Sequence, residues 1–184
     1  DSLGANLVPE VTAVYKLADV GPDALTTGRL PLRIHIADLS GLPMTCPYRT
    51  VKADTAATVL APMLRKFQEL WAQTSVGITF DPVTYVDSSA ATSIDAQMPT
   101  ALGDSLQEAS KNSGGGADLV LVRSITPDGS WGIAGGIPSA PAIKNNPRTG
   151  AVFAVSLLCA MDPRYGLPEL GATAAHELGH SFGL

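Results

Sequence analysis

The chain has 184 residues, which is enough for one domain with a sizeable buried core. Hydrophobic residues make up 45% of it and charged residues only 16%, a balance that excludes an intrinsically disordered chain. The formal net charge is −5 and the 12 lysines and arginines are scattered, so nothing suggests nucleic acid or an anionic membrane as a partner. No apolar run is long enough to cross a bilayer.

The first part of the chain begins with a weakly patterned segment, followed by a predicted strand and a predicted helix. Residues 1–30 have little pattern apart from a strand-like stretch at 11–17, and form an N-terminal segment that is either an extra strand or a prosegment remnant. Residues 32–39 alternate apolar and polar side chains, which predicts a half-buried strand. A helix follows over about 54–74, where Pro62 either kinks it or marks its true first turn.

The second part predicts three further elements before a glycine-rich region. Residues 78–86 are expected to form a strand and residues 100–112 a short helix. Residues 117–125 are mostly apolar, which is typical of a central strand. The stretch 130–138 is rich in glycine, which weakens a central strand but suits an edge that another chain approaches closely.

A last strand and a last helix complete the predicted order. Residues 151–159 form an apolar run that we interpret as a strand, and Pro168 is expected in the first turn of the final helix. The resulting order is strand, helix, strand, helix, three strands, helix. It predicts a mixed β-sheet with helices packed on it, an α/β fold.

The final helix ends in HELGHSFGL, a spacing that suits a metal site. His176 and His180 are four residues apart, so a helix places both imidazoles on one face, one turn apart, where they can bind one Zn²⁺. Glu177 lies within about 60° of His180 around the helix. Its carboxylate can therefore reach the open side of the metal without binding it, and accept a proton from zinc-bound water.

The other face of this helix is apolar and contains small residues. The apolar stripe recurs at intervals of four and consists of Leu170, Ala174, Leu178 and Phe182. Gly171 and neighbouring alanines are small, so we expect the helix to approach the sheet closely.

HELGHSFGL resembles the first part of the metzincin consensus H-E-x-x-H-x-x-G-x-x-H. Gly183 matches the glycine at which the active-site helix of that family ends and the chain turns sharply, a position that requires left-handed backbone angles. The resemblance implies a zinc metalloendopeptidase with His176 and His180 as zinc ligands and Glu177 as general base. It covers about 150 residues as a fold, but only the last nine carry the specific motif.

The resemblance also implies a particular architecture. Residues 31–184 would form the upper subdomain, with a twisted mixed sheet of about five strands, a backing helix and the active-site helix. One edge strand in the family pairs with an extended peptide substrate, and the stretch GIAGGIP resembles that strand in the adamalysin-like and pappalysin-like branches. The implied peptide-binding residues are Gly132, Ile133, Ala134, Gly135 and Gly136.

The family pattern continues past the end of this chain. The third zinc ligand is expected two residues beyond Leu184, followed by a lower subdomain that this chain lacks. We therefore expect the partners to be a peptide or protein substrate and the remaining C-terminal part of the same protease. His35 is the only other histidine, and we interpret it as a strand residue and not as a ligand.

The two cysteines, Cys46 and Cys159, fit either one disulfide or two buried free thiols. The resemblance favours the disulfide, because metzincins are mostly secreted, and it predicts an extracellular location. A rival role for Cys46 is a latency-conferring zinc thiolate, although the sequence around it does not match the cysteine-switch motif. Two functional alternatives also stay open: a noncatalytic binding module on the same scaffold, and an unrelated α/β domain with both C-terminal histidines on its surface.

Overall fold

The computed structural model describes residues 28–73, 77–111, 116–127, 129–138 and 144–184. Within them, five strands form one sheet in the order β2-β1-β4-β7-β6. The four parallel strands are β1 (Gly28–Ile36), β2 (Ile78–Asp87), β4 (Ala117–Val122) and β7 (Ala151–Ala154). The fifth, β6 (Gly132–Ala134), pairs antiparallel with β7 at one edge. This mixed sheet confirms the predicted α/β fold class.

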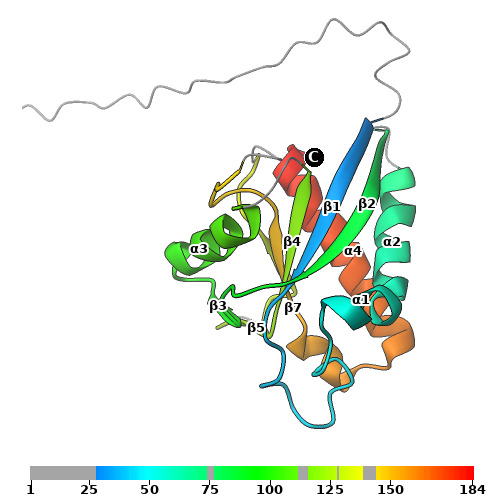
Figure 1. The fold of residues 1–184 in the computed structure, drawn as a ribbon, viewed down its shortest axis with the longest axis vertical. Helices are drawn as coiled ribbons and strands as arrows, with labels where there is room; N and C mark the ends of the chain where they lie inside the picture. The colour runs from blue at the N-terminus through cyan, green and yellow to red at the C-terminus, as the bar shows by residue number, and fades with distance from the viewer. Residues whose placement is uncertain (1–27, 74–76, 112–115, 128, 139–143) are drawn as a thin grey trace, which may run out of the picture.

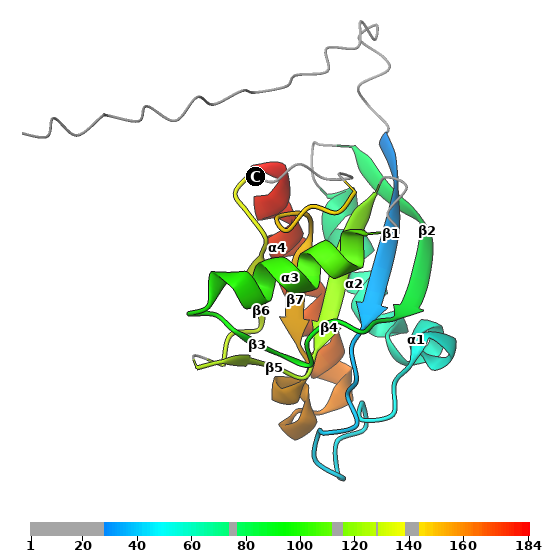
Figure 2. The same ribbon diagram turned by 60° about the vertical axis from the view of Figure 1, so that its left-hand side comes forward.

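The helices cover both faces of the sheet (Figures 1 and 2). The helix α3 (Pro99–Ser110) lies on one face, and α2 (Ala61–Ala72) and α4 (Pro163–Phe182) lie together on the other. The short helix α1 (Ala53–Val59) precedes α2. A small second sheet pairs β3 (Ser93–Asp95) with β5 (Ser124–Thr126) in parallel. No helix in these described ranges is long and apolar enough to cross a membrane.

The predicted long helix is two helices. The break comes at Leu60, whose backbone angles of −91° and 6° leave the helical region. Pro62 then lies in the first turn of α2, the second of the two positions expected for it. Its missing N–H is tolerated there because first-turn N–H groups have no partner within the helix.

Two predicted strands are shorter than expected. The run 117–125 divides at Arg123, because the chain leaves the main sheet after β4 and joins β3 through β5. The run 151–159 is a strand only as far as Ala154 and continues as the 3₁₀ helix η2 (Ser156–Ala160). An apolar run of this length cannot be assigned to strand or helix by periodicity alone.

The final helix is longer than predicted. It begins at Pro163, with the Asp162 side chain as its N-cap, so Pro168 lies inside it and not in its first turn. The strand-like stretch at 11–17 and most of the N-terminal segment fall outside the described residues. The strand β1 begins at Gly28, four residues before the predicted start.

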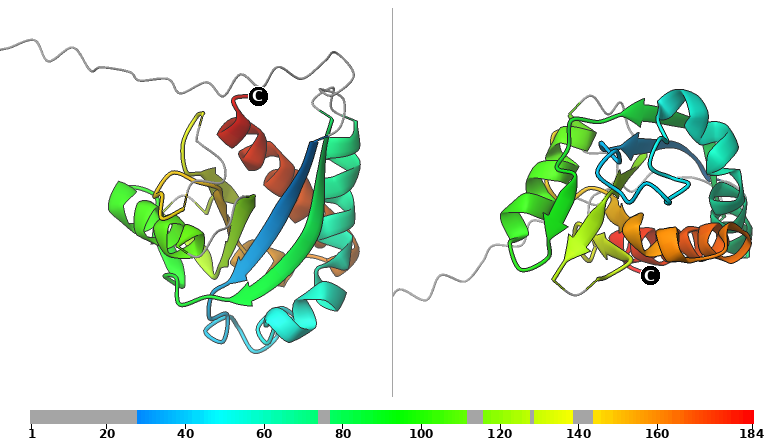
Figure 3. Two further views of the ribbon diagram at one scale, coloured as in Figure 1. Left: turned by 45° about the horizontal axis from the view of Figure 1, so that its top comes forward. Right: turned by 90° about the horizontal axis from the view of Figure 1, so that it is seen from below.

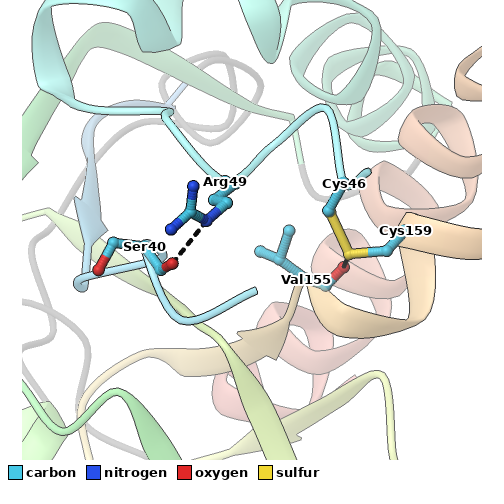
Figure 4. The surroundings of a disulfide bond; sticks show 5 residues. All are labelled: Ser40, Cys46, Arg49, Val155 and Cys159. Atoms are coloured by element: carbon cyan, nitrogen blue, oxygen red, sulfur yellow. Dashed lines mark hydrogen bonds between the residues drawn. A yellow bond between two sulfur atoms is a disulfide. The ribbon is translucent and has the colours of Figure 1, made fainter. Parts of the chain in front are cut away.

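The disulfide predicted between Cys46 and Cys159 is confirmed, with the two Cα atoms 4.6 Å apart. It joins the loop after β1 to η2, as Figure 4 shows. In the same loop, the Arg49 side chain donates a 2.7 Å hydrogen bond to the Ser40 carbonyl. Because Cys46 is bonded to sulfur, it is not a thiolate available to a metal.

Candidate metal centre

The helix α4 ends at a glycine, as the motif predicted. Gly183 has a φ of 80°, in the left-handed region, and its N–H donates to the His180 carbonyl at 3.0 Å. The N–H of Leu184 donates to the Gly179 carbonyl, also at 3.0 Å. These two bonds form a Schellman cap, which ends the helix one turn after His180.

The rings of His176 and His180 lie one above the other on the exposed side of this helix. Their centroids are 4.4 Å apart, and their Nε2 atoms approach to 3.0 Å. Two nitrogen ligands of a tetrahedral zinc ion, each bonded at about 2.0–2.1 Å, lie about 3.3 Å apart. The two imidazoles therefore fit two positions of a tetrahedral site after an adjustment of a few tenths of an ångström.

In the described part of the chain, no third metal-binding side chain joins the two histidines. His35 lies in β1, as predicted, and its Nε2 is 2.8 Å from Oδ1 of Asp118. That pair belongs to the side of the sheet covered by α3, whereas α4 covers the other side. The described residues therefore offer two side chains at this position, whereas a catalytic zinc site normally has three protein ligands.

The side chain of Glu177 is partly exposed and lies against the edge strand β6. A Cβ atom placed on Gly132 would be 2.9 Å from Cγ of Glu177 and 3.0 Å from Cγ2 of Thr173. The edge strand can thus pass this close to the helix only because Gly132 has no side chain. Thr173 was not among the predicted site residues. Its position one turn before Glu177, on the same face of the helix, could have indicated that it also lies against the edge strand.

The pairing of β6 with β7 decides which backbone groups face outward. Ala154 N–H donates to the Trp131 carbonyl, and Gly135 N–H donates to the Gly150 carbonyl at 2.9 Å. Alternate residues of an antiparallel strand face the partner strand, so Trp131, Ile133 and Gly135 direct their backbone groups toward β7. Of the five predicted peptide-binding residues, Gly132 and Ala134 in β6 direct theirs away from it, whereas Gly136 lies beyond the end of the strand.

A mainly apolar pocket of about 400 Å³ lies on the other side of the histidine pair. It is lined by Leu70 and Trp71 of α2 and by Ala175, Gly179 and Leu184, together with both histidines. Trp71 also packs against Phe182 and Phe80, at centroid distances of 5.5 and 5.1 Å. These ring contacts hold the C-terminal end of α4 against α2 and β2.

A buried ion network lies on the opposite face of the sheet. Asp118 is fully buried and accepts hydrogen bonds from Arg33 at 2.8 and 3.1 Å, besides its contact with His35. Burial alone raises the pKa of the Asp118 carboxyl, but the hydrogen bonds with His35 and Arg33 outweigh it and hold the pKa below the ordinary value. Asp118 is therefore a structural anion that ties β4 to β1.

No family model matches the chain, and no curated protein matches its sequence. Its fold is similar to that of mature mirolysin from Tannerella forsythia, solved in complex with a cleaved peptide, with a TM-score of 0.51 and 15% identity. The match covers 86% of this chain and 64% of mirolysin. Metalloproteinase-II from Bacteroides fragilis matches with a TM-score of 0.48 and 15% identity, over 86% of this chain and 43% of that one.

The chain therefore spans less than two thirds of either solved protein. At 15% identity, the likeness to mirolysin concerns the fold alone. It supports a metallopeptidase fold, in agreement with the resemblance found in the C-terminal motif.

Proposed function

We propose that this chain is the zinc-binding upper part of a secreted metalloendopeptidase of the metzincin type. The observation that supports this most directly is the arrangement at the end of α4. Two imidazole nitrogens lie 3.0 Å apart, and the intervening Glu177 packs against an edge strand at Gly132. One helical turn thus carries both imidazoles and a carboxylate, and it lies beside an edge strand that an extended peptide could join.

His176 and His180 would hold Zn²⁺ through their Nε2 atoms, with a third ligand expected beyond Leu184. Bound zinc would act as a Lewis acid toward the scissile carbonyl and lower the pKa of water to about 7. Both histidines present their nitrogens on the same side of the helix, so they need little rearrangement to bind the ion.

Glu177 would act first as general base and then as general acid. Its carboxylate accepts a proton from the attacking water and later transfers it to the leaving amine. The contact with Gly132 places this side chain beside the edge strand, where the substrate backbone would lie. A base on the same turn as both ligands needs no loop closure to reach the reacting atoms.

The edge strand would bind the substrate through its main chain. Gly132 and Ala134 direct their N–H and C=O groups away from β7, so an extended peptide can pair with them as an added strand. The proposed partners are therefore a peptide or protein substrate and the C-terminal remainder of the same protease. The Cys46–Cys159 disulfide supports an extracellular location, because such bonds persist in oxidising compartments.

The test is Glu177→Ala in the full protein, with Glu169→Ala as a matched control. Glu169 is an exposed glutamate on the same helix, two turns earlier. We expect Glu177→Ala to abolish peptide cleavage while one zinc per molecule stays bound, and Glu169→Ala to retain both properties. Peptidase activity that survives in Glu177→Ala would refute the role of this residue, and wild-type protein without zinc would favour the noncatalytic binding module.

A further inference from the structure

The carbonyl oxygen of Gly150 joins three elements around the site. It accepts hydrogen bonds from Oγ of Ser181 at 3.2 Å and from the Gly135 N–H at 2.9 Å. Ser181 belongs to α4, Gly135 directly follows the edge strand β6, and Gly150 directly precedes β7. A single acceptor therefore connects the active-site helix to the strand expected to bind the peptide.

Gly150 is itself held in one position. Its φ is 91°, and a Cβ atom there would lie 2.0 Å from the Asp118 carbonyl oxygen, so only glycine fits. Asp118 is in turn anchored in the core by Arg33 and His35. The acceptor of the Ser181 hydroxyl therefore lies directly against the backbone of Asp118 in β4, beside the buried ion network.

Ser181 and Glu177 share one face of α4. They are four residues apart, and the Ser181 hydroxyl shares its one proton between the Gly150 carbonyl at 3.2 Å and the Glu177 carbonyl at 3.4 Å. Side chains extend about 5–6 Å from the axis of a helix, so a rotation of α4 by about 10° moves the Glu177 carboxylate by about 1 Å. The bond between Ser181 and Gly150 opposes this rotation at a position one turn from the carboxylate.

We propose that Ser181 is a positioning residue that sets the distance between Glu177 and the edge strand. The proposal rests on the proposed peptidase function and assigns a role to a side chain that touches neither metal nor substrate. Ser181 is completely buried, so its hydroxyl acts within the protein and not on a ligand. A carboxylate displaced by about 1 Å can reduce turnover by up to about 100-fold without weakening substrate binding to the same extent.

The test compares Ser181→Ala with Ser110→Ala. Ser110 is a matched control because it is also fully buried and its Oγ bridges a helix to a loop carbonyl, that of Asn146, but on α3. In Ser181→Ala we expect kcat to fall about tenfold, with little change in KM and with zinc content retained. Ser110→Ala should lose similar thermal stability with kcat unchanged. Equal kcat effects in the two variants, or none in Ser181→Ala, would overturn the proposal.

A second measurement separates this proposal from the proposed function. In two-dimensional NMR spectra, the backbone amide signals of Gly132, Gly135 and Glu177 should shift in Ser181→Ala and stay in place in Ser110→Ala. Unchanged signals in Ser181→Ala contradict the positioning role, whether or not the protein cleaves peptides. A wild-type protein that cleaves no peptide contradicts the peptidase function, while the NMR comparison still decides the role of Ser181.

Discussion

At Gly171, α4 packs directly against the backbone of α2, and replacing this glycine with alanine should separate the two helices. A Cβ atom at Gly171 would lie 2.3 Å from the Met63 carbonyl oxygen and 3.0 Å from Cβ of Lys66. Both neighbours are backbone or backbone-proximal atoms, so neither can rotate away. The small residues of α4 were expected to permit close approach to the sheet, but at Gly171 the close approach is to α2.

The size of the effect follows from this overlap. Restoring an ordinary contact distance requires the helices to move apart by about 1 Å, and a gap of that size loses a quarter to a half of the dispersion attraction between facing atoms. Overpacking of this kind costs about 1–3 kcal/mol, and the higher helix propensity of alanine returns about 1 kcal/mol. Because the clash is with a backbone oxygen and a Cβ atom, the upper part of that overpacking range applies, about 2–3 kcal/mol. We therefore expect Gly171→Ala to reduce the free energy of unfolding by about 1–2 kcal/mol, which lowers Tm by about 3–6 °C.

Gly179→Ala is the matched control, since it makes the same substitution in the same helix. A Cβ atom at Gly179 would meet only Cβ of Leu184, at 3.9 Å, so there is room for it. Alanine should therefore stabilise this position by about 0.5–1 kcal/mol through backbone entropy. The two variants are predicted to shift Tm in opposite directions.

The assay is thermal unfolding followed by circular dichroism, with chelator present so that metal binding does not contribute to Tm. A Gly171→Ala protein at least as stable as the wild type would refute the reasoning. Shifts of the same sign in Gly171→Ala and Gly179→Ala would also refute it, because intrinsic propensity and not helix contact would then decide the outcome.

Three further outcomes are expected. Asp118→Asn should destabilise the protein by about 3 kcal/mol in thermal unfolding, because it leaves buried positive charge uncompensated. The pKa of Asp118 is lower in the folded state than in the unfolded state, so the folded state favours the ionised carboxylate. The stabilisation from this carboxylate is therefore fully present at neutral pH. It is lost as the pH falls below 3.8, the ordinary pKa of an aspartate. The Tm of Asp118→Asn should therefore fall less steeply than that of the wild type over this pH range. Replacing both Cys46 and Cys159 with serine removes a crosslink between residues that are 113 positions apart. The unfolded chain then gains conformational entropy, so the free energy of unfolding should fall by about 4 kcal/mol in denaturant titrations. Gly132→Ala should reduce peptide cleavage at least tenfold with zinc content retained, since the added methyl group displaces Glu177; unchanged turnover would contradict the contact.

The grouping of the candidate site residues could be predicted from local spacing, because one helical turn brings them together without help from the rest of the fold. His176 and His180 share a face by helical geometry alone, and Gly183 ends the helix through its own backbone freedom. The edge position of β6 was also predictable, since glycine is unfavourable inside a sheet.

Two of the wrong element boundaries have one cause, namely that an apolar run does not record where the chain changes direction, and a third comes from a helix cap. Residues 151–159 are apolar throughout, yet the chain turns after Ala154 so that Cys159 can reach Cys46. The strand predicted over 117–125 ends at Val122 because the next residues pair with β3, a strand too short to be recognised. Pro168 lies inside α4 because the Asp162 cap starts that helix earlier than the hydrophobic pattern indicates.

The sequence by itself determined the class of the sheet, the ends of most elements within a few residues, and the helical turn that groups the candidate metal ligands. These depend on period, propensity and caps, which act over fewer than about ten residues. Only the tertiary structure decided that Gly132 lies against Glu177, that Gly171 lies on Met63, and that Ser181 shares an acceptor with Gly135. Each of these contacts joins residues far apart in the chain. Figure 3 shows how α4, coloured orange to red, runs across one face of the sheet. Such contacts follow from the packing of whole elements, which no local pattern specifies.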